Sequence, residues 1–145
     1  MKAPRIMLAA GRSGSGKTMI TCGLLRALQQ MGKQPAAFKC GPDYIDPMFH
    51  REVLGVDSKN LDLVFSEEDI LKEGYLKHTK DADITITEGV MGFYDGMSLD
   101  SVKGSSYDVA QTLGLPVILV INARGAAMTL VATVKGIAEF RPDSN

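Results

Sequence analysis

The chain has 145 residues, 45% of them hydrophobic and 23% charged, which is the composition of one globular domain with a buried core. A formal net charge of −1 excludes the strongly basic surface that attracts nucleic acid or anionic membranes, so we expect neither as a partner. No apolar run is long enough to span a bilayer, and two isolated cysteines, Cys22 and Cys40, favour a reducing cytoplasm over a disulfide framework or a zinc site.

A phosphate-binding loop is predicted near the N-terminus, where residues 11–18 read G-R-S-G-S-G-K-T. A short apolar strand over 6–10 precedes the loop, and an amphipathic helix over 18–31 follows it. In such loops the backbone N–H groups and the positive end of the helix attract phosphates, the lysine reaches the β- and γ-phosphates, and the threonine hydroxyl binds Mg²⁺. The predicted nucleotide-binding residues are Gly11, Arg12, Ser13, Gly14, Ser15, Gly16, Lys17 and Thr18.

A second loop rich in carboxylates is predicted after the next strand. The first helix should end at Gly32, and residues 35–40 should form a strand. The following stretch, 41–47, reads G-P-D-Y-I-D-P and places Asp43 and Asp46 at the carboxyl end of that strand, where open α/β sheets bind ligands. Gly-Pro and Asp-Pro pairs are also common in plain turns, but the neighbouring phosphate loop favours a site.

The middle of the chain carries a weaker pattern. Residues 47–60 are predicted to form a polar surface excursion with one short helix over 47–54, and Ser66 is predicted to open a capped helix that continues to Lys77. His50 and His78 are too far apart in sequence to be argued as a pair. We expect each to be solvated or locally hydrogen-bonded, without a catalytic role.

A third strand is predicted over 83–88, where the sequence alternates and is β-branched. Glu88 ends this strand and a glycine-broken loop with Asp95 follows it. Such a loop can be a simple tight turn, but a carboxylate at this position in a chain with a phosphate loop is typical of a metal-directed acid. We expect Glu88, Asp43 and Asp46 to lie at strand ends outside the sheet, where replacement leaves stability almost unchanged.

The C-terminal third is predicted to contain a helix that starts at Ser105 and ends at Gly114, a strand over 116–121 and a last helix over 126–140. The strand is uninterrupted and apolar, as expected for one buried on both faces. Four strands that alternate with helices predict an α/β fold with a doubly wound parallel sheet. The loops after the strands, including 122–125, should then line one crevice.

Four stretches together resemble one known family. The phosphate loop, F-K-C-G-P-D-Y-I-D-P at 38–47, N-L-D at 60–62 and T-E-G-V-M-G-F-Y-D-G at 87–96 are similar, in order and spacing, to the N-terminal ATPase domain of the cobyrinate a,c-diamide synthase family. The resemblance covers nearly the whole chain, and the stretches at 38–47 and 87–96 discriminate best. Dethiobiotin synthetase and cobyric acid synthase are wider relatives of the same kind.

The resemblance implies an ATP-dependent ligase that amidates the a and c acetate carboxylates of cobyrinic acid, or a related tetrapyrrole, with ammonia from glutamine. The substrate carboxylate attacks the γ-phosphate to give an acyl phosphate, which ammonia displaces. Lys17, with Mg²⁺ on Thr18 and Glu88, would neutralise the meeting anions. Lys39 would bridge the phosphate and the carboxylate.

The resemblance also suggests roles for the remaining acids. Asp46, and with it Asp43, would hold Mg²⁺ or position ammonia and the macrocycle, and the sequence leaves the division between the two open. Asp95 is included as a further catalytic candidate. The family also carries a glutamine amidotransferase domain with a nucleophilic cysteine, which neither Cys22 nor Cys40 matches.

The chain stops at Asn145, so we expect an N-terminal fragment that cannot use glutamine alone and that associates as a dimer or larger through its C-terminal third. Two alternatives stay open. One is a dethiobiotin synthetase-like ligase acting on another acid. The other is a partition-type dimerising ATPase switch, although those proteins carry lysine where this chain has Arg12 and have no counterpart of 41–47.

Overall fold

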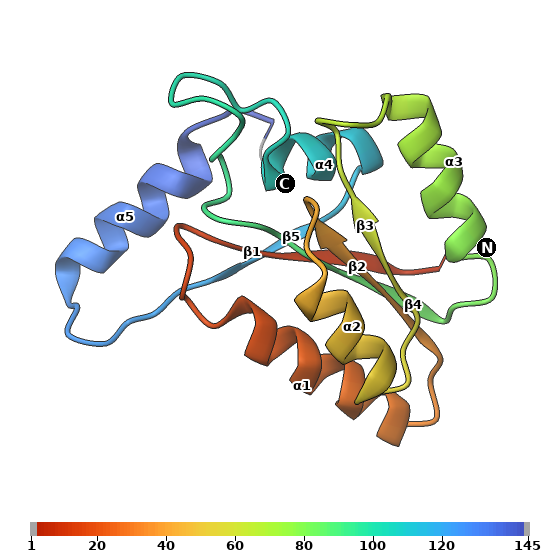
Figure 1. Ribbon diagram of the computed structural model, residues 1–145. Coiled ribbons are helices and arrows are strands. Elements are labelled where there is room, and N and C mark those ends of the chain that lie inside the picture. The colour runs from red at the N-terminus through yellow and green to blue at the C-terminus, as the bar shows by residue number, and fades with distance from the viewer. Residues whose placement is uncertain (1–2, 144–145) are drawn as a thin grey trace.

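The computed structural model describes residues 3–143 as a five-stranded sheet in the order β3-β2-β4-β1-β5, with every pair of neighbouring strands parallel (Figure 1). The strands are β1 (Arg5–Ala10), β2 (Pro35–Cys40), β3 (Ser58–Leu61), β4 (Ile84–Glu88) and β5 (Val117–Val120). The helices are α1 (Lys17–Gln30), α2 (Ile45–Glu52), α3 (Glu68–His78), α4 (Ser106–Leu113) and α5 (Met128–Glu139). The predicted doubly wound parallel sheet is confirmed.

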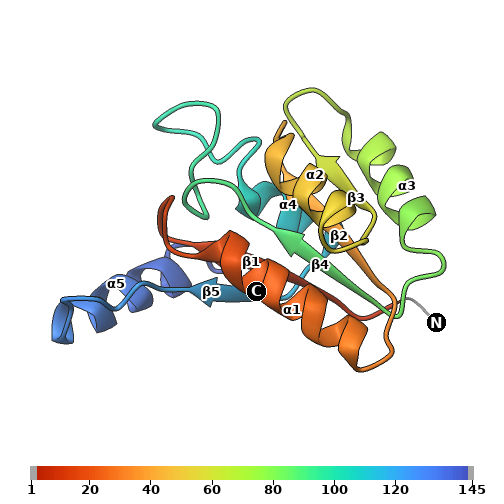
Figure 2. The same cartoon turned by 60° about the horizontal axis from the view of Figure 1, so that its bottom comes forward.

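Helices cover both faces of the sheet (Figures 1 and 2), and a hydrophobic layer lies beneath them on each face. Side chains alternate along a strand, so in β1 Met7 packs in the layer under α3 and α4, whereas Leu8 packs in the layer under α1. Phe38 and Leu25 are the corresponding buried anchors from β2 and α1. Each such side chain contributes about 1.5–3 kcal/mol when fully buried, and the two layers fix the strand ends that carry the polar loops.

The strand β3 was not predicted, because the sequence there was interpreted as a polar excursion. It is an edge strand that pairs only with β2, and its central residues Lys59 and Asn60 are exposed while Ser58 and Leu61 are buried. An edge strand of four residues therefore shows no apolar run. The short helix expected after Pro47 is present as α2 and begins slightly earlier.

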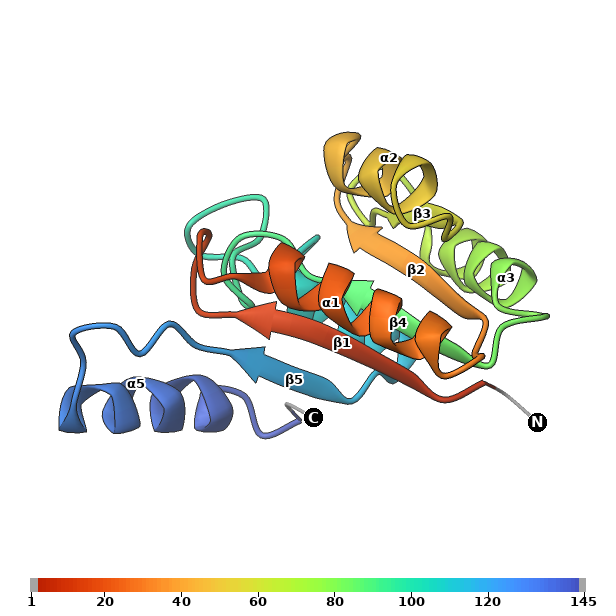
Figure 3. The same ribbon diagram turned by 90° about the horizontal axis from the view of Figure 1, so that it is seen from below.

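Two further expectations are corrected. The helix expected to be capped by Ser66 begins at Glu68, and its N-cap residue Glu67 makes no side-chain cap hydrogen bond. The strand β5 is not buried on both faces: it lies at the sheet edge, and Ile118 is 48% exposed. The last helix, α5, lies beyond this edge (Figure 3), and none of its residues is buried. By contrast, Ser105 caps α4 and Gly114 ends it, as predicted.

Within residues 3–143, no helix is both long enough and apolar enough to cross a membrane.

The carboxyl ends of the parallel strands all lie at one end of the sheet, and the loops that follow β1, β2 and β4 meet there (Figure 1). The order β2-β4-β1 places the loop after β4 between the other two. This end of the sheet therefore brings together the phosphate loop, the loop 41–47 after β2 and the loop that follows β4.

Candidate nucleotide site

The phosphate loop forms the tight turn between β1 and α1 that the sequence predicts. Gly14 and Gly16 have φ angles of 72° and 97°, in the left-handed region that glycine adopts without strain. The hydroxyl of Ser15 donates to the carbonyl oxygen of Arg12 at 2.9 Å and closes the loop on itself. The first turn of α1 contains no acidic residue, so the positive end of the helix is free to attract an anion.

Lys17 lies across this loop and is buried. Its Nζ donates to the carbonyl oxygen of Met91 at 2.8 Å and, more weakly, to that of Arg12 at 3.4 Å. Burial lowers the pKa of Lys17, and the nearby Lys39 ammonium adds to the effect, while Glu88 opposes it. An ammonium group held by two carbonyl oxygens exchanges those neutral acceptors readily for the oxygens of a phosphate.

Lys39 and Glu88 form a buried ion pair that the strand register imposes. The two residues face each other across β2 and β4, and Lys39 Nζ lies 2.8 Å from Glu88 Oε1. Glu88 is fully buried and Lys39 nearly so. Burial alone would lower the pKa of Lys39, but Glu88 and Asp46 outweigh it, so the pKa is raised and the ammonium stays charged. Glu88 is thus the last residue of its strand and lies inside the protein, not outside the sheet as expected.

Asp46 and Thr18 lie beside this ion pair, and the four residues together form a polar cluster. Asp46, in the first turn of α2, accepts a hydrogen bond from Lys39 Nζ at 2.5 Å. The Thr18 hydroxyl donates to Glu88 Oε1 at 2.6 Å and lies 3.3 Å from Asp46 Oδ2. The start of α1, the start of α2 and the end of β4 therefore converge on one group of oxygens around a single ammonium.

The other two predicted acids have different surroundings. Asp43 Oδ1 accepts from the backbone N–H groups of Ile45 and Asp46 at 2.9 and 3.2 Å, and its second oxygen lies 3.7 Å from Lys39 Nζ. It therefore holds the start of α2 and contacts the cluster only at its margin. Asp95 is exposed and accepts from the N–H of Gly92 at 2.8 Å, which closes the loop after β4. In the described structure Asp95 makes no direct contact with the cluster.

The four loops do not line one crevice, contrary to expectation. A cavity of about 430 Å³ is lined by the phosphate loop, Lys39, Asp43 and residues 88–91. A separate cavity of about 350 Å³ is lined by Gly11, Arg12 and Ser15 together with residues 120–126 and α5. Because β1 lies between β4 and β5 in the sheet, the phosphate loop that follows β1 separates the two cavities. Asn122 itself caps the N–H of Arg124 at 3.0 Å.

Two supporting residues were not predicted from the sequence. Asn60, on β3, donates its amide to the carbonyl oxygens of Gly41 and Asp43 at 2.6 and 2.7 Å and so holds the acidic loop. Ser106 both accepts from the N–H of Val90 and donates to its carbonyl oxygen. Asn60 lies in the N-L-D stretch that contributed to the resemblance, but only the pairing of β2 with β3 shows what it does.

Comparison with known proteins shows the family to which the chain belongs. A family model described as the CobQ/CobB/MinD/ParA nucleotide binding domain matches residues 6–139, which include every loop of the site. The chain belongs to this family. Its resemblance to cobyrinate a,c-diamide synthase is confirmed as well, because relatives of that name are about two-fifths identical along almost all of its length.

The relatives of this CobQ/CobB/MinD/ParA family member are longer proteins. Cobyrinate a,c-diamide synthase of Priestia megaterium is 41% identical over 145 residues, which are 100% of this chain and 32% of that protein. The enzymes of Syntrophotalea carbinolica and Thermoplasma acidophilum are 43% and 41% identical, over 99% and 97% of this chain and 31% of each relative. The chain thus spans about a third of their length. A crystal structure of hydrogenase maturation factor HypB from Archaeoglobus fulgidus aligns over 94% of this chain and 90% of that chain, with a TM-score of 0.47 and 14% identity.

The oxygen cluster of this family member fits a magnesium ion held together with a nucleotide. Thr18, Asp46 and Glu88 supply one hydroxyl and two carboxylates, and Glu88 Oε2 is buried without a hydrogen-bond partner in the described structure. No three His, Cys, Asp or Glu side chains within residues 3–143 form a metal cage by themselves. Mg²⁺ commonly binds through one or two carboxylates and completes its shell with water and substrate phosphates.

His50 lies beside this cluster and is fully buried, so it is locally bonded and not solvated. Its Nδ1 lies 3.1 Å from the Ser58 hydroxyl, and its Nε2 has no hydrogen-bond partner among the described residues. Burial lowers the pKa of His50, and Lys39 adds to this, while the charges of Glu88, Asp46 and Asp43 oppose it. The folded protein therefore resists protonation here more strongly than the unfolded chain.

We predict that this histidine makes the fold sensitive to acid. Its stabilising effect should be complete above the unfolded pKa of about 6.5 and should be lost as the pH falls toward the lower folded pKa. Urea unfolding at about pH 7.5 and about pH 5.5 should show a smaller difference for His50→Gln than for the parent chain. An equal pH dependence in both proteins would contradict the assignment.

Proposed function

We propose that this chain is the nucleotide-binding part of an enzyme that amidates the a and c acetate carboxylates of cobyrinic acid, or of a related tetrapyrrole, at the expense of ATP. The ammonia would come from glutamine through an amidotransferase domain outside this sequence. One observation carries the proposal: two buried lysines, Lys17 and Lys39, line the same cavity as the buried Glu88, with which Lys39 is paired at 2.8 Å. The first faces the phosphate loop and the second faces the acidic loop.

Two anions must meet in this reaction, and the two lysines divide the task. A substrate carboxylate oxygen attacks the γ-phosphorus, and the bond from that phosphorus to the bridging oxygen of ADP breaks, which gives an acyl phosphate. Lys17 and the loop N–H groups would hold the moving phosphoryl group. Lys39 would hold the attacking carboxylate near it. Preorganised positive charge of this kind is commonly a large contribution to catalysis.

The amide forms in the second step. Ammonia attacks the acyl carbon, the carbon–oxygen bond to phosphate breaks, and a proton leaves the nitrogen. Because the pKa of Lys39 is raised, this residue acts as a fixed positive charge and not as the base that takes the proton. Thr18, Asp46 and Glu88 would hold Mg²⁺, which supplies positive charge to the phosphates when it is bound.

The test uses the full-length protein that contains this sequence. With ATP, Mg²⁺ and glutamine it should convert cobyrinic acid to the diamide, followed by mass spectrometry as the replacement of two carboxyl groups by amides. Asp46→Asn should reduce turnover by at least about 100-fold, the usual loss for a group that supports transition-state charge. Glu73→Gln, an exposed acid on α3, should have no effect.

Two results would redirect the proposal. Amidation or carboxylation of another acid, with cobyrinic acid untouched, would indicate a dethiobiotin synthetase-like ligase. ATP hydrolysis that depends on dimerisation and yields no new product would indicate a partition-type switch.

We also propose that the 145-residue chain associates through its C-terminal third. Ile118 on the edge strand and Val131 on α5 are 48% and 60% exposed, and an open edge of this kind pairs readily with a second copy. A few hundred Å² of apolar contact, at about 25 cal/mol per Å², supplies several kcal/mol. Light scattering should report a dimer or larger species at high micromolar concentration, with no glutamine-dependent amidation. A stable monomer would contradict the association.

A further inference from the structure

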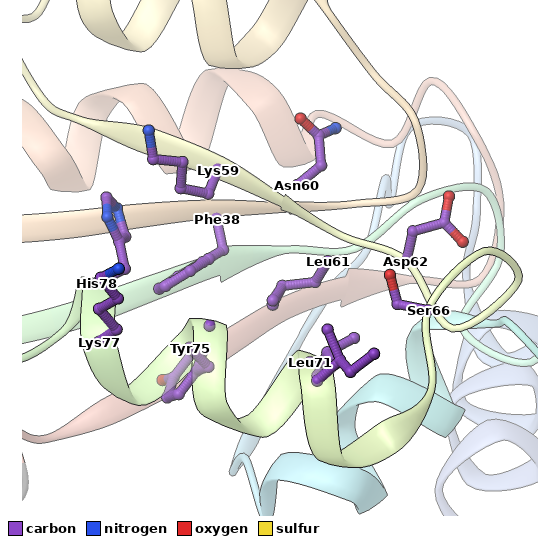
Figure 4. A pocket seen from close by; sticks show the side chains of 12 residues that line it. Phe38, Lys59, Asn60, Leu61, Asp62, Ser66, Leu71, Tyr75, Lys77 and His78 are labelled. Carbon is purple, nitrogen blue, oxygen red and sulfur yellow. The ribbon is translucent and has the colours of Figure 1, made fainter.

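A cavity unrelated to the phosphate loop opens between the edge strand β3 and helix α3 (Figure 4). Its volume is about 530 Å³, which lies within the usual range of small-molecule sites. Phe38 and Leu61 come from the sheet, and Leu71 and Tyr75 come from the helix. The rings of Phe38 and Tyr75 are stacked with their centroids 4.7 Å apart. Phe38 and Tyr75 are only 1% and 3% exposed, so they support the floor of the cavity, and its open apolar surface comes from residues such as Ile70.

The helical wall of this cavity lacks a side chain at one position. Gly74 lines the cavity from the interior of α3, and a Cβ added there would meet no atom within 4 Å. Ile70, one turn earlier on the same stripe of the helix, is 63% exposed. Glycine weakens a helix interior, and no tight packing requires it here. The absent side chain leaves open space beside an exposed apolar residue.

One end of the cavity is basic. Figure 4 shows Lys59, Lys77 and His78 together at this end. A single carboxylate, Asp57, serves two of them, at 3.6 Å from Lys59 Nζ and 3.4 Å from His78 Nδ1. Lys77 makes no ion pair within residues 3–143. This end is therefore complementary to an anion.

Two enclosed polar atoms of the lining have no hydrogen-bond partner in the part of the chain that the structure describes. They are Nε2 of His78 and Oδ2 of Asp62. Figure 4 places these two residues at opposite ends of the cavity. Both atoms are buried within the protein itself, so an occupant of the cavity would meet the exposed Lys77 instead.

We propose that this cavity binds an apolar small molecule that carries one carboxylate or sulfonate. Its apolar body would lie in the open space beside Ile70 and Gly74, and its anionic group would face Lys77. The apolar surface and the basic end favour this class over a purely apolar ligand and over a nucleotide, whose several phosphates would need more positive charge than Lys77 supplies.

The test is a fluorescence titration of the 145-residue chain with anilinonaphthalene sulfonate, an aromatic sulfonate with an amine donor. One dye should bind per chain. Gly74→Leu fills the open space and should weaken binding more than about tenfold, while Lys77→Gln should weaken it about threefold, as expected for one exposed charge. The matched control is Lys72→Gln on the same helix: Lys72 pairs with Glu68 at 3.0 Å, does not line the cavity, and should leave the affinity unchanged.

An uncharged analogue, phenylnaphthylamine, separates the charge from the shape. It should bind the parent and Lys77→Gln equally and should still be excluded by Gly74→Leu. Circular dichroism and ATP binding check that Gly74→Leu is folded; if it is not, the comparison of Lys77→Gln with Lys72→Gln decides. Unchanged dye affinity in the position 74 and 77 variants, or no saturable binding by the parent, would overturn the proposal.

Discussion

Lys17→Ala is expected to weaken the binding of ATP with Mg²⁺ by about 1.5–3 kcal/mol, which is the contribution of a charge-assisted contact to phosphate. The dissociation constant should rise by a factor of roughly 10 to 150. Among residues 3–143, the Lys17 ammonium makes two hydrogen bonds, both to carbonyl oxygens, at 2.8 and 3.4 Å, so its removal should leave the fold intact. Titration calorimetry measures the loss directly.

The control for this experiment is Lys33→Ala, which removes an exposed lysine beyond the end of α1. It should bind the nucleotide like the parent. Equal affinity in Lys17→Ala and Lys33→Ala would show that the loop does not hold phosphates through Lys17, and the nucleotide site would have to be sought elsewhere.

Much of this site could be predicted because the residues of the phosphate loop are contiguous and their spacing alone carries the chemistry. Asp46 and Glu88 were also predicted, since each ends or follows a recognisable strand. Their shared contacts with Lys39 and Thr18 were not: these depend on β4 lying between β1 and β2, an order that the local pattern does not encode. The sequence therefore predicts which residues lie at the site, but not the ion pairs and hydrogen bonds between them.

The errors have a common physical origin in the two edges of the sheet. At one edge, β3 exposes Lys59 and Asn60 and so resembles a loop. At the other, β5 is as apolar as a central strand although Ile118 is half exposed. Apolar content therefore does not distinguish an edge strand from a central one, because edge position depends on the order of the strands in the sheet.

Glu88→Ala is expected to destabilise the free chain by about 3 kcal/mol, the lower end of the cost of breaking a buried ion pair. Glu88 Oε1 accepts hydrogen bonds from both Thr18 and Lys39, and removal of the carboxylate leaves the buried ammonium with Asp46 and the more distant Asp43. The melting temperature should fall by roughly 6–12 °C for a chain of this size. This replaces the expectation that an acid at this position contributes little to stability.

Asp95→Asn is the matched control, because Asp95 is an exposed acid in the loop that directly follows β4. Thermal unfolding of this variant should stay within a few degrees of the parent, as for other surface changes of about ±0.5 kcal/mol. If Glu88→Ala melts with the parent, the contacts of Glu88 with Lys39 and Thr18 do not stabilise the folded state.

The strand order has a consequence for how the chain reaches this state. Thr18 and Lys39 meet Glu88 across 70 and 49 residues of sequence, and β1 and β2 are synthesised first but must leave a strand-wide gap for β4. Contacts between distant segments form slowly, since loop closure must precede them. A nascent chain that has exposed only the phosphate loop therefore lacks the acid that completes the site. Retention on immobilised ATP would then select chains in which the central strand, β4, has already inserted. Binding of the nucleotide would therefore measure the fraction of chains that have completed folding.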